Sequence, residues 1–138
     1  MKAKNNGQSL IEVLAALAMA ALVILGIVKA TTVSVKNANY SQGQTQAVSL
    51  AQKKISEIIS VKNNSPVTFF NNLPGYPNET VGQFCLKTTL TDISPVNPPG
   101  AKMAKIQVIV YWGENGAGSQ CNSKQYSHNY QVETNVTN

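Results

Sequence analysis

Residues 10–28 read LIEVLAALAMAALVILGIV, and this apolar stretch decides how the chain folds. Glu12 is the one ionisable side chain within it, and Lys29 follows its last residue. At 1.5 Å per residue these 19 residues form a helix about 28 Å long, which matches the roughly 30 Å hydrocarbon core of a bilayer. The stretch therefore predicts a membrane-spanning helix.

The residues that precede the apolar stretch predict its orientation. Residues 1–9 read MKAKNNGQS and carry Lys2 and Lys4 but no acid. Because basic residues beside a first helix stay in the cytoplasm, we expect a cytoplasmic N-terminus and an extracytoplasmic chain after Lys29. The alternative is a cleaved secretory signal ending near Ala30. Against it, the apolar run exceeds the usual length of about 7–15 residues and contains an acid.

The composition limits the classes of protein to which the chain can belong. Of 138 residues, 43% are hydrophobic and 12% are charged, which excludes a charge-rich disordered tail and leaves room for one small globular domain. The net charge is +5, yet all 11 basic residues are lysine. Lysine lacks the planar fork with which arginine holds phosphates, so this charge only weakly supports nucleic-acid binding.

The segment Gly7-Gln8-Ser9-Leu10-Ile11-Glu12-Val13-Leu14 resembles the N-terminal signature of type IV prepilins and type II secretion pseudopilins. In that family a membrane peptidase cuts after the glycine, on the cytoplasmic side, and methylates the new N-terminus. The resemblance implies a leader at residues 1–7, cleavage between Gly7 and Gln8, and Glu12 as the fifth mature residue. Most members begin with an apolar residue, usually Phe, so Gln8 is a departure. An unmethylated Gln8 could cyclise and lose its amine, and we expect methylation to prevent this.

The mature amine at Gln8 and the carboxylate of Glu12 are predicted to direct assembly. They lie one helical turn apart, about 6 Å along the axis. In a fibre of packed helices, the amine of an incoming copy can pair with Glu12 of a neighbour. Two buried charges penalise every register that leaves either one unpaired, so the pair can specify assembly even if it adds little net stability.

The helix is predicted to continue to residue 62, so that residues 8–62 comprise a membrane half at 10–28 and an amphipathic half at 29–62. Lys53 and Glu57 are four residues apart and can pair weakly. Gly26 and the polar stretch Ser41–Gln46 around Gly43 are the predicted weak points. The sequence Asn63-Asn64-Ser65-Pro66 ends the helix. The apolar stripe of the second half recurs at helical spacing. It comprises Ala47, Val48, Leu50, Ala51, Ile55, Ile58 and Ile59.

Residues 63–138 are predicted to form a small head of short strands. Alternating patterns mark strands at 81–90 and 103–112, and a last strand near 128–136. Ile106, Val108, Val110 and Trp112 share one face, which we expect to pack on the helix stripe. Asn115-Gly116, with nearby glycines, predicts the reversal between the last two strands. The fold class is therefore α+β, pilin-like, with a long helix on an antiparallel sheet.

Cys85 and Cys121 are the only cysteines. An even number in an oxidising compartment favours one disulfide, and the loop of 36 residues would add about 3.5–4 kcal/mol in the chain-entropy model. Because Cys85 alternates with Phe84 and Leu86, the bridge is expected on the outer face of the sheet. Two buried free thiols are the alternative.

The sequence gives no reason to expect catalysis, a metal or a cofactor. His128 is the only histidine, and Asp92 and Glu79 are expected in separate loops without partners. No cysteine cluster with metal-ligand spacing and no phosphate-binding loop is present. We therefore expect a structural protein rather than an enzyme.

Residues 47–60 and the pair Tyr111-Trp112 look like those of V-type minor pilins, and the I-type pseudopilins are the nearest rival. The resemblance implies a minor type IV pilin of the bacterial inner membrane and pilus, with roles in adhesion or twitching motility. Its partners would be other pilins, the prepilin peptidase and methylase, the inner-membrane assembly platform, and lipid before assembly.

Two other functions are weighed beside this one. The first is an I-type pseudopilin of type II protein secretion, in which the same helix serves a secretion piston. The second is a DNA-binding pilin, whose mature side-chain charge would be 9 − 6 = +3 after loss of Lys2 and Lys4. DNA is the least favoured partner. The lysines that could share a face of the head are Lys87, Lys102, Lys105 and Lys124.

Overall fold

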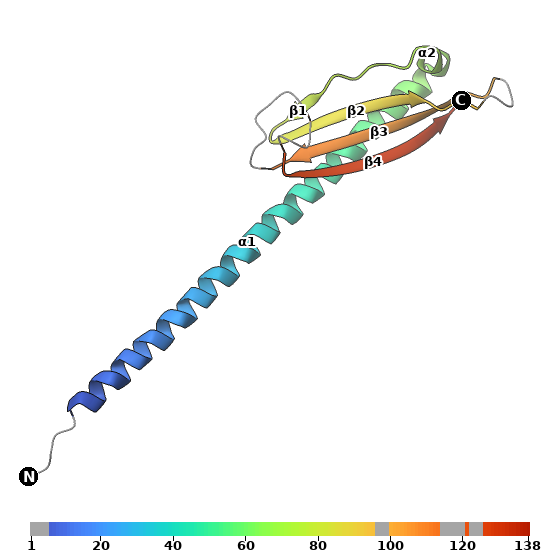
Figure 1. Ribbon diagram of the computed structural model, residues 1–138. Coiled ribbons are helices and arrows are strands. Elements are labelled where there is room, and N and C mark those ends of the chain that lie inside the picture. Colours follow the sequence, from blue (N-terminus) through green and yellow to red (C-terminus); the bar gives the residue numbers. More distant parts are fainter. Residues whose placement is uncertain (1–5, 96–99, 114–120, 122–125) are drawn as a thin grey trace, which may run out of the picture. The chain divides into compact units, whose positions relative to one another are not determined.

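The computed structural model describes residues 6–95, 100–113, 121 and 126–138, and gives side-chain surroundings from residue 10 onward. The described residues form helices α1 (Asn6–Asn64) and α2 (Pro66–Asn71) and strands β1 (Glu79–Val81), β2 (Phe84–Asp92), β3 (Met103–Trp112) and β4 (His128–Thr137). The strands make an antiparallel sheet in the order β1-β2-β3-β4 (Figure 1). The predicted α+β fold, a long N-terminal helix with an antiparallel sheet, is confirmed.

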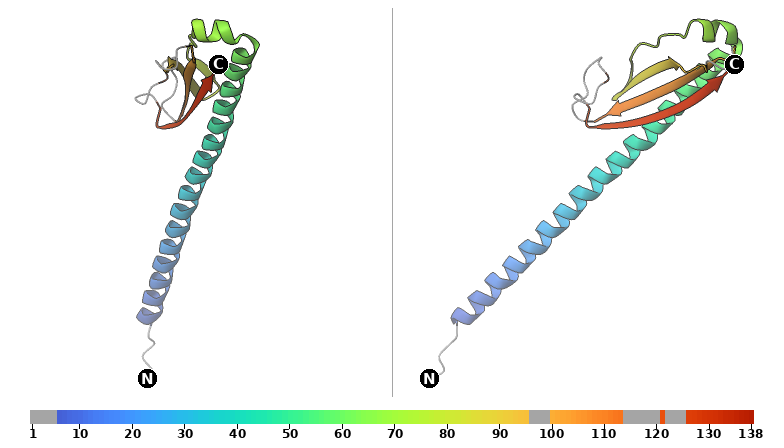
Figure 2. Two further views of the ribbon diagram at one scale, coloured as in Figure 1. Left: turned by 90° about the vertical axis from the view of Figure 1, so that its right-hand side faces the viewer. Right: turned by 45° about the vertical axis from the view of Figure 1, so that its right-hand side comes forward.

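The chain divides into two compact units, Met1–Ser41 and Gln42–Asn138. The first contains the apolar part of α1. The second contains the rest of α1, α2 and the sheet. From here on, the head means this whole unit, Gln42–Asn138, and so includes the end of α1. Within the head, α1 lies along one face of the sheet (Figure 2).

The core of the head lies between α1 and the sheet. On the helix, Ala47, Ala51 and Ile58 are fully buried, while Leu50, Ile55 and Ile59 pack at the edges, as the predicted stripe requires. On β3, burial alternates with the strand period, and the predicted inward face is confirmed. That face comprises Ala104, Ile106, Val108, Val110 and Trp112, of which Trp112 is 4% exposed and the others 0%.

Small side chains on α1 let the sheet approach the helix closely. Gly43 is buried, and a methyl group built on it would lie 2.7 Å from Nε1 of Trp112. The sequence predicts a weak point here, but the helix continues through Gly43 without interruption. The glycine leaves space for the indole ring of Trp112.

Two predictions about the secondary structure of the head are wrong. Residues after Pro66 were expected to begin the strands, but they form α2, which starts with Pro66 at its first turn and buries Phe69 and Phe70. Residues 81–90 were expected to form one strand, but Gly82, at φ +58°, turns the chain and separates β1 from β2. The expected reversal at Asn115-Gly116 lies outside the described residues.

Gly43→Ala should destabilise the head, because the new methyl group must displace the buried ring of Trp112. We expect a loss of about 1–3 kcal/mol in the free energy of unfolding, measured by denaturant titration in detergent. Gly26→Ala is the matched control in the same helix, since nothing beyond its chain neighbours and the adjacent helix backbone lies within 4 Å of a Cβ placed there. Equal effects of the two substitutions would contradict the packing described for Trp112.

Candidate functional site

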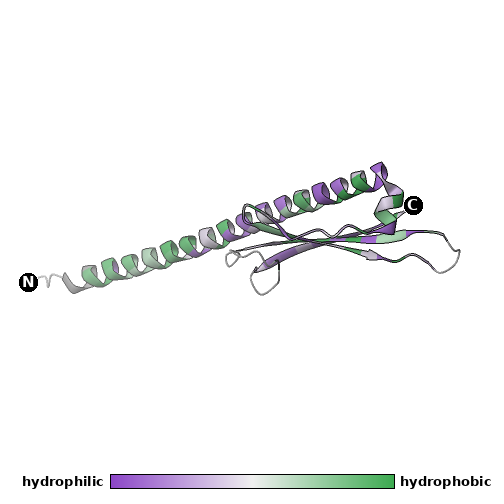
Figure 3. Cartoon of the chain, turned by 90° about the horizontal axis from the view of Figure 1, so that it is seen from above, coloured by the Kyte–Doolittle hydropathy of each residue, from purple (hydrophilic) through white to green (hydrophobic). Residues whose placement is uncertain are grey.

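The first unit presents an apolar surface on every side of α1. The large apolar side chains from Leu10 to Val28 are 54–70% exposed. Figure 3 shows the hydrophobic colour over this part of the helix and mixed colours beyond it. A helix that is apolar all round is stable in lipid or inside a protein assembly but not in water.

This segment has the length and composition of a membrane span. Among the described residues, α1 from Leu10 onward is the one helix apolar enough to cross a bilayer, and none of its most apolar window is buried within the chain. A single exposed helix near an N-terminus is also typical of signal sequences, so the span alone does not identify the protein.

The predicted processing residues lie at the start of α1. The helix begins at Asn6, so the backbone at Gly7 and Gln8 is helical. Glu12 follows in the same helix and is exposed among apolar side chains. The side chain of Gln8 lies outside the described surroundings. The geometry within one copy thus brings Glu12 and the predicted mature N-terminus onto one end of the apolar surface.

The other end of the apolar surface is marked by two hydroxyl groups. Thr31 and Thr32 donate hydrogen bonds from Oγ1 to the carbonyl oxygen of Val28, at 2.9 and 2.8 Å. Both hydroxyls are therefore satisfied by the helix itself, next to Lys29. The sequence signal for this feature is a pair of hydroxyl residues three and four positions after Val28.

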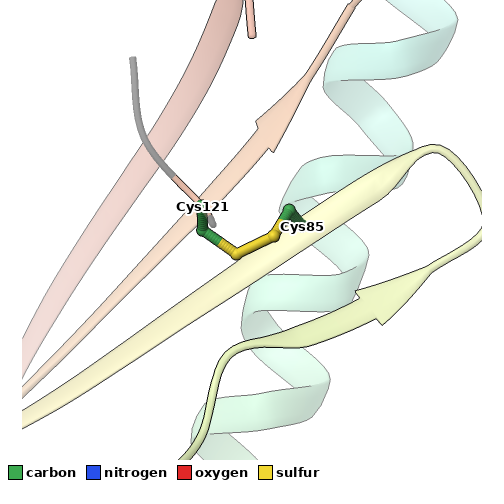
Figure 4. Close-up of a disulfide and its surroundings, with 2 residues drawn as sticks. All are labelled: Cys85 and Cys121. Atoms are coloured by element: carbon green, nitrogen blue, oxygen red, sulfur yellow. A yellow bond between two sulfur atoms is a disulfide. The ribbon is translucent and has the colours of Figure 1, made fainter. Parts of the chain in front are cut away.

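The head carries the predicted disulfide on the outer face of the sheet. Cys85 of β2 is bonded to Cys121, with their Cα atoms 5.4 Å apart (Figure 4). The two cysteines are 0% and 4% exposed, because they pack with Tyr111 and Tyr126 in a second small core. The sequence predicted on which face of the sheet the bridge lies, but not that tyrosines pack around it. Tyr111 lies opposite Cys85 in the sheet register and so shares its face.

Lys54 holds the segment before β2 against the helix. Its Nζ lies 3.2 Å from Glu57 Oε2 and 3.0 Å from Glu79 Oε2, and 5.4 Å from the ring centre of Tyr76. Burial lowers the pKa of Lys54, but the hydrogen bonds and charges of the two carboxylates outweigh it, and the pKa is raised overall. For the neighbouring Tyr76, burial raises the pKa, and the charge of Glu57 raises it further.

These contacts correct two predictions. Glu57 pairs with Lys54 instead of Lys53, and Glu79 has a partner.

Asp92 also has a partner, contrary to the sequence prediction. Its Oδ1 accepts a hydrogen bond from the backbone N–H of Ser94 at 2.8 Å. Hydrogen bonds from the side chain and backbone of Ser94 lower the pKa of Asp92. The Ser94 hydroxyl bonds in turn to the backbone of Met103. Asp92 therefore organises the end of the β2–β3 pair.

One of the lysines of the candidate basic face, Lys105, is paired with an acid. Lys105 pairs with Glu133 at 3.2 Å, and the Glu133 carboxylate also accepts from Gln107 and Gln131. Hydrogen bonds, first from Gln107 and then from Lys105, lower the pKa of Glu133. Lys87 lies opposite Ile109, four residues along β3 from Lys105. Lys124 lies outside the described residues.

His128 is half-buried in β4, with its ring centre 5.6 Å from that of Trp112. Within the described ranges, no three residues among His, Cys, Asp and Glu come close enough together to hold a metal ion.

Comparison with known families gives one match. Residues 2–28 match the family model of the prokaryotic N-terminal methylation motif. This is the type IV prepilin-like signal, and it supports a type IV pilin-like or pseudopilin-like protein. The match covers residues 2–28, which include the apolar segment, but not the head. Neither the curated proteins nor the solved structures gave a match.

Breaking the disulfide should destabilise the head by about 2–4 kcal/mol, because the unfolded chain regains the freedom of the closed loop. The measurement is the denaturant midpoint of the full chain in detergent, with and without reductant. The double variant Cys85→Ser/Cys121→Ser is the control, and its midpoint should be low and insensitive to reductant. An unchanged midpoint of the native chain after complete reduction would count against the stabilising role.

Proposed function

We propose that this chain is a minor type IV pilin. It is cut after Gly7, methylated at Gln8, held in the inner membrane by residues 10–28, and drawn into a pilus by packing of its helix. The observation that carries the proposal is the coincidence of two features. The methylation motif covers the same residues that form an apolar helix exposed on all sides.

Cleavage at Gly7 explains why the apolar segment is retained. A secretory signal is removed after its apolar core, whereas the proposed cut lies before it. The mature chain then keeps an apolar surface that is soluble in lipid and can exchange lipid for neighbouring helices. Lipid tails and apolar side chains are about equally favourable surroundings for this surface. The exchange of lipid for neighbouring helices therefore needs a more specific interaction to direct it.

Glu12 supplies that interaction. An acid at the centre of a membrane helix costs about 2.5 kcal/mol or more. Acids within membrane helices are therefore typically functional. Its proposed partner is the mature amine of a neighbouring copy. Pairing between copies displaces one helix along the other by about one turn, roughly 6 Å, and so fixes the stagger of the assembly.

The head is consistent with an extracytoplasmic location. The buried Cys85–Cys121 bridge is typical of oxidising compartments. Lys2 and Lys4 favour a cytoplasmic N-terminus, which leaves the head on the opposite side of the membrane. DNA binding is not proposed, since Glu133 neutralises Lys105.

An I-type pseudopilin would use the same apolar surface and the same Glu12. The two functions differ in the assembly that takes up the chain: an extracellular pilus or the periplasmic piston of type II secretion. Expressing the chain in cells that hold only one of these systems separates them, because the proposal requires recovery in sheared pili.

Glu12→Ala should insert in the membrane normally but enter pili poorly. We expect at least about a tenfold loss of the variant from sheared filaments, since tenfold corresponds to only about 1.4 kcal/mol. Immunoblots of the membrane and filament fractions measure both steps. Glu57→Ala removes the same side chain from the head part of α1 and should assemble normally. Normal incorporation of Glu12→Ala would refute the role of the charge pair.

A further inference from the structure

Strand β4 leaves a long sheet edge open. It pairs with β3 over ten residue pairs, from Met103↔Thr137 to Trp112↔His128, and no described strand pairs with its other side. Proteins commonly protect such edges with short strands, bulges, proline or lysine. β4 contains no proline or lysine, its register with β3 is continuous, and its one acid is Glu133. Its composition thus favours pairing with another strand.

The hydrogen-bond pattern shows which residues face this edge. The N–H of Asn138 donates to the carbonyl of Lys102, so these two form a bonded pair with β3 just beyond the strand end. Bonded and non-bonded pairs alternate in an antiparallel ladder, and the odd-numbered residues of β4 therefore direct their backbone groups to the open edge. The carbonyl of Thr137 confirms this, because it accepts from the Lys62 side chain.

The open edge is self-complementary. Residues 129–135 read NYQVETN, and a reversed copy centred on Val132 places similar or complementary residues opposite one another. The facing pairs are Asn129 with Asn135, Tyr130 with Thr134, Gln131 with Glu133, and Val132 with itself. All the odd-numbered members direct their backbone groups across the edge, so the register is also correct for hydrogen bonding.

We propose that β4 binds β4 of a second copy of this chain, antiparallel, about a two-fold axis through Val132. The four odd-numbered positions of each strand would exchange about eight backbone hydrogen bonds and join the two sheets into one. Gln131 would face Glu133 of the other copy, which avoids a contact between two acids. The adjacent register, centred on Glu133, would place the acids opposite one another and is disfavoured.

The same pairing covers apolar surface on the inner face of the sheet. Tyr130 and Val132 are half-buried side chains that already pack against the core of the head. A second copy of β4 would bring Val132 against Val132 and Tyr130 against Thr134. The interaction therefore combines main-chain hydrogen bonds with side-chain burial, as in other cases of strand addition.

The symmetry determines which copies can meet. Antiparallel strands in one continuous sheet are related by an axis normal to that sheet, so residues 42–64 of α1 in the two copies would run in opposite directions over the same face. The pairing thus joins two heads whose own parts of α1 are antiparallel. It differs from the parallel packing of helices within one assembly and does not depend on the proposed function.

Site-directed cross-linking tests this register. Val132→Cys places one thiol of each copy beside the two-fold axis. The Cα atoms of a non-bonded pair are about 4.5 Å apart, a distance that a disulfide between the two thiols can span. Thr134→Cys is the matched control on the same face of β4, and its two copies would lie about 13 Å apart. Full-length chains would each be carried in a separate nanodisc, mixed and mildly oxidised. We expect at least about tenfold more disulfide-linked dimer for Val132→Cys than for Thr134→Cys.

A charge substitution provides a second measurement. Gln131→Glu would place an acid opposite Glu133 of the other copy at both symmetry-related positions. The repulsion should reduce cross-linking through Val132→Cys at low salt. Adding Glu133→Gln restores one acid per pair and should recover it. Equal cross-linking at positions 132 and 134, the absence of cross-linking at 132, or indifference to Gln131→Glu would each overturn the proposal.

Discussion

The exposed apolar surface between Leu10 and Val28 is the constraint on which the rest of the chain depends. None of its most apolar window is buried within the chain, so lipid or another protein must cover it. The methylation motif matched over residues 2–28 includes this surface, and the proposed cleavage before it would leave the surface on the mature chain. In the proposed assembly, Glu12 gives direction to contacts that are otherwise non-specific, because it is the only charged side chain in the segment.

The head is stabilised differently, because a small sheet has few residues with which to bury its apolar side chains. Gly43, Ala47 and Ala51 let the sheet approach α1 closely, and Trp112 fills the space beside Gly43. On the opposite face, the Cys85–Cys121 bridge and its tyrosines form a second core. The sheet is thus supported from both sides, which offsets the small size of each core.

The parts of the fold that local patterns determine could be predicted from the sequence. The long helix, β3 with its buried face, and the disulfide with its position on the outer face followed from periodicity and cysteine number. Two of the wrong predictions involve tertiary contacts: α2 is stabilised by burial of Phe69 and Phe70, and Glu79 meets Lys54 across 25 residues. The turn at Gly82 had a local signal, but the alternation of residues 81–90 concealed it. At the candidate site, the roles of Gly7, Gln8 and Glu12 stay predictions from the motif, and the structure adds the exposure of the apolar surface that begins at Leu10.

The central claim is that processing removes the leader and leaves the apolar helix attached. Mass spectrometry of the N-terminal peptide, after co-expression with a prepilin peptidase, tests it most directly. We expect a mature chain that begins at Gln8 and is heavier by one methyl group. A mature chain that begins after Ala30 would contradict the account, because no apolar helix would remain to assemble. Loss of ammonia from Gln8 would contradict the charge pair, since the amine that Glu12 requires would be gone.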